Sequence, residues 1–107
     1  MSVNPFRGEV TITIDGKEHL MRLSLGSLAG LEAELGTDGL LPLIQRFEEG
    51  RFSTKDLIAL LAAGLKGGGW DGSAEDLEQA QIEGGILVAA RAAGELLALA
   101  FSLPKAE

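Results

Sequence analysis

Residues 9–25 alternate between apolar and polar side chains with a period of two. The apolar positions of the first run, Val10, Ile12 and Ile14, are β-branched, and such residues favour strands. Asp15-Gly16 follows, a dipeptide typical of two-residue hairpin turns. A second alternating run then continues to the end of this segment. The pattern predicts a β-hairpin.

The register of this hairpin follows from the turn. A two-residue loop pairs Ile14 with Lys17, Ile12 with His19 and Val10 with Met21, and a four-residue loop would preserve the same two faces. One face then collects the apolar side chains of both strands: Val10, Ile12, Ile14, Met21 and Leu23. An isolated hairpin is marginally stable in water, so we expect other elements to cover this face.

The rest of the chain has the spacing of amphipathic helices separated by glycines. The expected helices run from a cap at Ser27 to about Leu35, from Thr37 or Asp38 to about Glu49, from Leu57 to Leu65, from Ser73 through Ile82, and from Ile86 to Phe101. Ser53 and Ser73 each precede an Asp by three residues, which predicts a capping box at the start of the third and fourth helices. Pro42 is compatible with the first turn of the second helix.

The last of these helices is apolar nearly all round, which predicts a position at the centre of the bundle. It contains Arg91 and Glu95 and is shorter than a membrane span requires. The expected fold class is α+β, with an N-terminal β-hairpin packed on a bundle of four to five α-helices. We expect a single domain over residues 1–107, with the hairpin at 9–25, the bundle at 27–102 and a tail at 103–107.

Composition narrows the function classes. The chain has 9 Lys and Arg against 16 Asp and Glu, a net charge of −7, and it has no Cys. Binding nucleic acid through its phosphates requires clustered basic residues, so no nucleic-acid partner is expected. The absence of Cys excludes thiolate metal sites and cysteine nucleophiles. No signal segment and no membrane span is evident, which favours the cytoplasm and no membrane partner.

Candidate catalytic chemistry is sparse. His19 is the one histidine, and its position in the middle of a strand indicates a packing residue rather than a general base. Lys66 precedes three glycines, whereas a phosphate-binding loop places its Lys after them, so residues 66–69 indicate a helix end. No metal-ligand spacing is present. We therefore expect no enzyme activity, no cofactor and no metal.

One stretch is a candidate for partner binding. Trp70 follows three glycines, and residues 67–90 contain five carboxylates and no Lys or Arg. Exposed Trp residues are frequent anchors in interfaces, and acidic clusters steer basic partners. The candidate surface consists of Trp70, Asp71, Glu75, Asp76 and Glu78. The alternative is that Trp70 packs inward and the acidic side chains are only solvated.

Several short segments also resemble a known family. These are Arg7-Gly8-Glu9-Val10, Asp15-Gly16, the run from Leu23 to Glu32, Gly50-Arg51-Phe52-Ser53, Ala63 to Gly68, and Glu83-Gly84-Gly85. Together they resemble the gene-transfer-agent family of phage-tail proteins over about residues 4–101. The shared residues are turn glycines, helix caps and leucines, so the resemblance carries over no catalytic residue.

The resemblance implies a small cytoplasmic assembly factor similar to the tail-assembly chaperones of long-tailed phages. Such a chaperone would bind the tape-measure protein or the tail tube protein while the tube polymerises. The alternative is a structural subunit of the tail that remains in the particle. An assembly factor needs an acidic body and apolar surface for its partner, and the sequence supplies the first directly.

Overall fold

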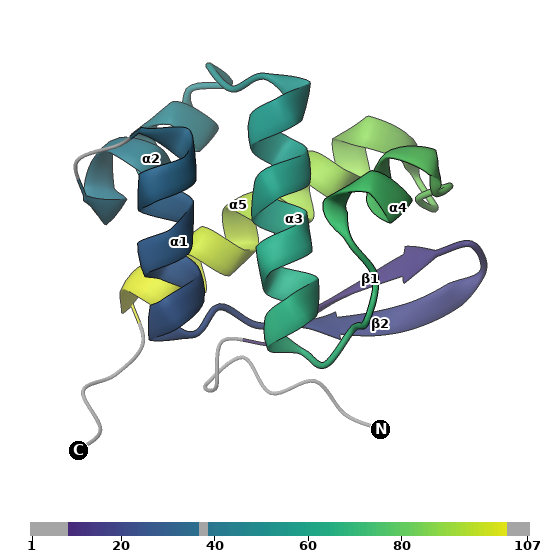
Figure 1. Ribbon diagram of the computed structural model, residues 1–107. Helices are drawn as coiled ribbons and strands as arrows, with labels where there is room; N and C mark the ends of the chain where they lie inside the picture. Colours follow the sequence, from purple (N-terminus) through teal and green to yellow (C-terminus); the bar gives the residue numbers. More distant parts are fainter. Residues whose placement is uncertain (1–8, 37–38, 103–107) are drawn as a thin grey trace.

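The computed structural model describes residues 9–36 and 39–102 (Figure 1). Within them, a two-stranded antiparallel hairpin is followed by five helices, which confirms the predicted α+β class. The elements are β1 (Val10–Ile14), β2 (Lys17–Met21), α1 (Leu25–Leu35), α2 (Leu40–Glu48), α3 (Thr54–Gly67), α4 (Ala74–Gln79) and α5 (Gly85–Ser102).

The hairpin has the register that the sequence predicts. Val10 pairs with Met21, Ile12 with His19, and Ile14 with Lys17. Asp15 and Gly16 both have positive φ, 51° and 83°, as a two-residue turn of this twist requires. The predicted apolar face is buried at every position: Val10, Ile12, Ile14, Met21 and Leu23.

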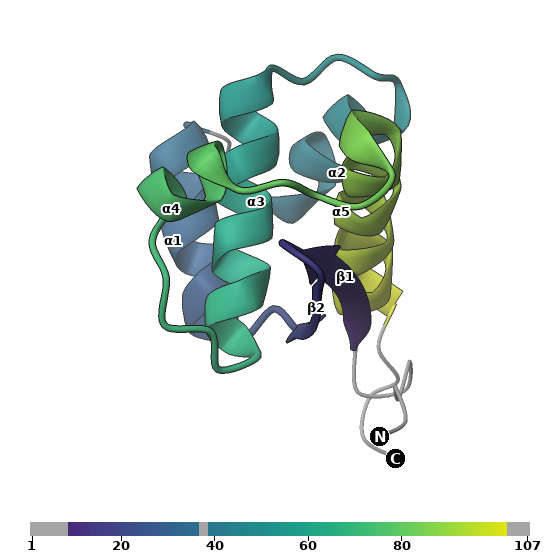
Figure 2. The same cartoon turned by 90° about the vertical axis from the view of Figure 1, so that its right-hand side faces the viewer.

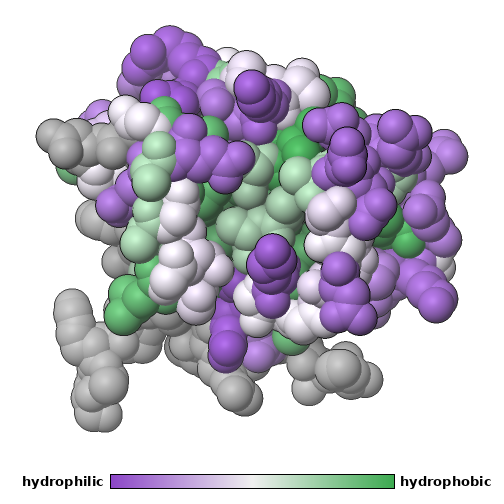
Figure 3. Space-filling model, in the orientation of Figure 1, coloured by the Kyte–Doolittle hydropathy of each residue, from purple (hydrophilic) through white to green (hydrophobic). Residues whose placement is uncertain are grey.

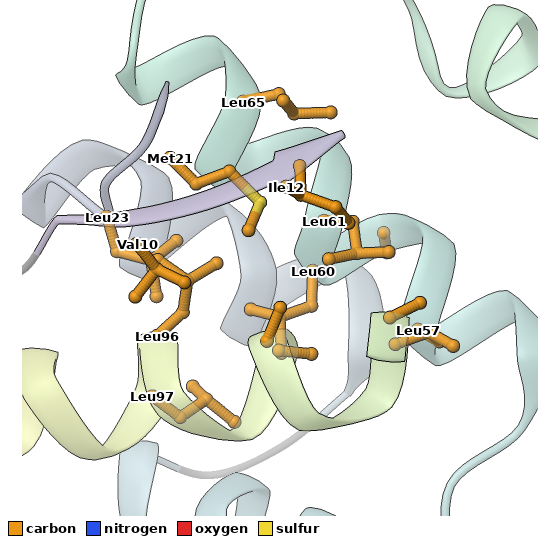
Figure 4. Packing of buried hydrophobic residues seen from close by; sticks show 14 of the residues in the cluster. Val10, Ile12, Met21, Leu23, Leu57, Leu60, Leu61, Leu65, Leu96 and Leu97 are labelled. Carbon is orange, nitrogen blue, oxygen red and sulfur yellow. The ribbon is translucent and has the colours of Figure 1, made fainter. Parts of the chain in front are cut away.

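Two helices cover that face. Figure 2 shows the hairpin between α3 and α5, with β2 against α3 and β1 against α5. Leu60, Leu61 and Leu65 of α3 are almost completely buried, and Leu96 and Leu97 of α5 approach them from the other side (Figure 4). The core therefore lies between the hairpin, α3 and α5.

The central helix is α3, and the prediction that the last helix occupies this position is wrong. α3 contacts α1, α4, α5 and β2. α5 buries one side only, because Ile86 and Leu87 in its first turn point to solvent along with Arg91 and Glu95. The apolar residues on all sides of α5 therefore give the protein exposed apolar surface, and the helix is not completely buried.

The C-terminal end of α3 lies directly on β2. The carbonyl of Gly64 accepts a hydrogen bond from the backbone N–H of Arg22 at 2.9 Å. A Cβ atom at Gly67 would lie 1.9 Å from the Arg22 carbonyl oxygen, and one at Gly68 would lie 1.9 Å from that of Leu20. These glycines thus end the helix, as the sequence predicts, and also permit a close backbone approach.

The helix caps agree with the predictions in two cases of three. Ser53 and Ser73 both form the predicted capping boxes, with Asp56 and Asp76. The predicted cap at Ser27 is wrong, because Ser24 is extended and its hydroxyl accepts from the Ser27 N–H, so α1 begins three residues earlier.

The other helix ends differ slightly from the predictions. α3 is longer than predicted and continues through Gly67. α2 begins at Leu40 after Gly39, without a side-chain cap. The predicted start at Thr37 or Asp38 and the predicted tail at 103–107 lie outside the described residues.

The fourth helix is shorter than predicted, because the chain after it pairs with the hairpin. α4 ends at Gln79, and Ala80 is extended. Ile82 forms an isolated antiparallel bridge with Ile14. Two backbone hydrogen bonds flank this bridge: the Asp15 N–H donates to the Gln81 carbonyl at 2.8 Å, and the Glu83 N–H donates to the Thr13 carbonyl at 3.0 Å.

Candidate partner-binding surface

Trp70 lies half-buried at the end of the loop that follows α3. Its backbone N–H donates to the Leu65 carbonyl at 2.9 Å, and its ring meets His19 edge-on at 6.4 Å between centroids. Gly72 lies so close that a Cβ there would be 2.2 Å from the Trp70 ring. One part of the indole thus packs on the protein, while the remainder borders a hollow that Asp71 and His19 also line.

The predicted acidic residues lie on and before α4, and all are exposed: Asp71, Glu75, Asp76 and Glu78. Asp76 also accepts a hydrogen bond from the Ser73 N–H at 3.0 Å in the capping box, so its carboxylate stabilises the start of α4. Leu77 points the other way and is buried against α3. The result is a short helix with one apolar anchor and an acidic outer face.

The structure does not bring the five predicted site residues to one hollow. Trp70 and Asp71 border the hollow beside the hairpin, whereas Glu78 borders a separate groove between α3, α4 and α5. Glu75 and Asp76 are exposed on α4 and line neither. That all five act as one docking surface stays a prediction.

The groove beside Glu78 was not found by sequence reasoning. We call it the α3–α4–α5 groove; it encloses about 260 Å³, and its walls come from α3, α4, the extended segment after α4, and the first turns of α5. Its apolar lining includes Leu57, Ile58, Leu61, Ile82, Ile86 and Ala89. The sequence feature nearest to it is the run of apolar residues at the start of the last helix, and the apolar pattern alone places these residues in the core.

Exposed apolar side chains lie at this groove and next to it along α5. Ile86 is 60% exposed, the adjacent Leu87 is 76% exposed, and Val88 is 39% exposed. Two more large apolar residues, Leu25 and Leu41, are exposed at the starts of α1 and α2. Of these sites, the start of α5 combines several consecutive apolar side chains with a groove, which is typical of a protein-binding surface.

A second groove lies between α1 and α3 and encloses about 320 Å³. Small residues dominate it, and Figure 3 shows the pale apolar band on this face within a hydrophilic surround. Glu34 and Lys66 both border it, so charges of opposite sign meet there. This groove therefore gives no electrostatic indication of a partner.

The described residues contain neither a candidate metal site nor a candidate membrane span. In residues 9–36 and 39–102, no group of three or more His, Asp or Glu side chains could hold a metal ion. Over the same part of the chain, none of the helices has the length and apolar character needed to cross a bilayer.

Comparison with known proteins identifies the family. The family described as "phage tail tube protein, GTA-gp10" matches residues 7–103. The chain belongs to this family. Searches among curated proteins and among solved structures found no match. The resemblance to gene-transfer-agent tail proteins is thereby confirmed, and the chain is a phage-tail protein that takes part in protein–protein assembly of a tail.

Proposed function

We propose that this tail protein is a tail-assembly chaperone. It binds another tail protein, the tape-measure protein or the tube protein, while the tail tube polymerises, and it leaves before the particle is complete. It acts in the cytoplasm and by binding alone, without catalysis, cofactor or nucleic acid.

One observation supports this role more than any other. Ile86 and Leu87 expose apolar surface beside an open apolar groove, in a chain of a phage-tail family. A chaperone of assembly must offer apolar surface to a partner that is itself apolar before it is assembled, and it must remain dissolved while it does so. The net charge of −7 keeps such a chain apart from its own copies.

A structural subunit of the tail is the second candidate. The description of the family names a tail tube protein, and this wording favours a chain that stays in the particle. A tube subunit also requires apolar contact surface, because rings and helical filaments form through heterologous interfaces between copies. The composition of finished particles separates the two roles.

The binding step is tested by affinity capture from cells that produce the particles, with this chain as bait. We expect the tape-measure protein or the tube protein to be enriched over a capture from the same cells without the bait. Enrichment of neither protein by the unmodified chain would contradict the proposal.

A further inference from the structure

We propose that the α3–α4–α5 groove binds a basic amphipathic helix of a partner protein. The inference rests on the proposed function, because it names the chemistry of the segment that such an assembly factor would recognise. The occupant is a segment of another tail protein and not a second copy of this chain.

The apolar part of the groove suits one face of a helix. On the α3 side, half-buried Ile58 borders the groove, with the buried Leu57 and Leu61 beneath it, and Ile86 of α5 borders the other side. Leu87 follows Ile86 and is exposed beside the groove without lining it. A helix laid in such a groove anchors with side chains three and four positions apart, which form a single apolar stripe.

The charge around the groove selects the polar face of that helix. Glu78 lines the groove directly, and Glu83 follows Ile82, another lining residue. Glu75 is one turn before Glu78 on the exposed side of α4. Lys55, next to the lining residue Thr54, offsets part of this charge at one end. Exposed Arg91, one turn after Leu87 on α5, is a second basic residue near the groove. Glu78 is the charged residue that lines the groove itself, and it favours Lys and Arg beside the apolar stripe of the occupant.

Strand addition is a poorer fit than helix binding at this place. The edge of β1 that is not paired with β2 already forms backbone hydrogen bonds with residues 81–83, through Gln81 and Glu83. On the other strand, the Arg22 N–H is bonded to the Gly64 carbonyl. A partner strand would have to displace these bonds, whereas a helix satisfies its own backbone groups.

Synthetic peptides test the inference. The probe is a peptide of about 18 residues, long enough to form a helix, with Leu at helical spacing on one face and Lys on the other. A second peptide has Glu in place of each Lys, and a third has the composition of the first in an order without an apolar stripe. Fluorescence anisotropy at low and at high salt measures the affinity of each.

We expect the basic amphipathic peptide to bind about tenfold or more tightly than either control peptide, and to lose affinity as salt rises. Equal binding of the basic and acidic peptides would overturn the charge argument. If the scrambled basic peptide bound as tightly as the amphipathic one, the binding would reflect only attraction between opposite net charges, and this result would also overturn the inference.

Variants of the protein place the interaction on the groove. Ile86→Asp should weaken peptide binding about tenfold or more, because Ile86 lines the groove. It should not unfold the chain, because Ile86 is exposed and an acidic residue in the first turn of α5 suits the helix dipole. Leu25→Asp is the matched control: it changes an 86% exposed Leu in the first turn of α1, a helix that contributes no residue to the groove. Unchanged binding by Ile86→Asp, with the fold verified by circular dichroism, would refute the site.

A second copy of this chain is the competing occupant. Sedimentation at rising concentration would detect it as a dimer that Ile86→Asp converts to a monomer, and that result without peptide binding would overturn the inference. The proposed function fails separately. Capture of a tail protein that Ile86→Asp does not affect leaves the chaperone role intact and refutes the groove, whereas peptide binding without capture of any tail protein refutes the chaperone role.

Discussion

Gly67→Ala should destabilise the protein, although the change adds a single methyl group within a helix. The new Cβ would lie 1.9 Å from the carbonyl oxygen of Arg22, which is a backbone atom and cannot rotate away. Either the end of α3 or strand β2 must move. That movement strains the nearby hydrogen bond from the Arg22 N–H to the Gly64 carbonyl.

The magnitude follows from three terms. Ala in place of Gly within a helix contributes about 0.5–1 kcal/mol of stability. Overpacking of this kind costs about 1–3 kcal/mol. Loss of the Arg22–Gly64 hydrogen bond costs a further 0.5–1.5 kcal/mol or so. The unfavourable terms are larger, so we expect a net loss of about 1–3 kcal/mol in the free energy of unfolding.

Gly94→Ala is the matched control, because Gly94 lies within α5 and nothing would lie within 4 Å of its Cβ. It should stabilise the protein by about 0.5–1 kcal/mol. Urea titrations followed by far-UV circular dichroism measure both changes in the free energy of unfolding. Thermal melts give a second measure, because each kcal/mol shifts the melting temperature by about 4–8 °C for a chain of this size. A Gly67→Ala protein as stable as the Gly94→Ala protein would refute the close approach of α3 and β2.

Three further predictions concern other parts of the molecule. Ile12→Asp buries a charge on the inner face of the hairpin and should lower the free energy of unfolding by about 3 kcal/mol or more, whereas Thr11→Asp on the other face should lower it by about 1 kcal/mol or less. Equal losses of stability in thermal melts would contradict the face assignment. Trp70→Ala should lower the free energy of unfolding by about 2 kcal/mol, less than the loss of a fully buried Trp, because the ring is half-buried against His19. An unchanged melting temperature would instead favour Trp70 as a residue that docks a partner. No salt-sensitive DNA binding should appear in a gel shift at low salt, because the net charge of −7 repels phosphate, and micromolar binding there would contradict this expectation.

The elements that the sequence predicts well are those set by neighbouring residues. The turn at Asp15-Gly16 fixes the register of the hairpin, and the alternation of side chains fixes its buried face. The capping boxes at Ser53 and Ser73 are likewise satisfied within a single turn. At α1, Ser24 and Ser27 both meet the local rule for a cap, and local chemistry alone did not choose between them.

The features that the sequence predicts poorly depend on distant contacts. α4 ends early because Ile82 pairs with Ile14, a residue far away along the chain. The α3–α4–α5 groove combines walls from residues 54–89, so no short pattern indicates it. The apolar start of α5 resembled core sequence, and only the placement of neighbouring elements shows that Leu87 is exposed. The direction of Trp70 likewise follows from its contact with His19 across the fold.

Quantitative mass spectrometry of purified, tail-bearing particles tests the chaperone role most directly. The same measurement on lysates of the producing cells gives the reference, as the ratio of this chain to the tube subunit. The account predicts that the chain is abundant in the lysate and absent from the particles. A particle that contains this chain in copy numbers comparable to those of the tube subunit would contradict the account and establish it as a structural subunit of the tail.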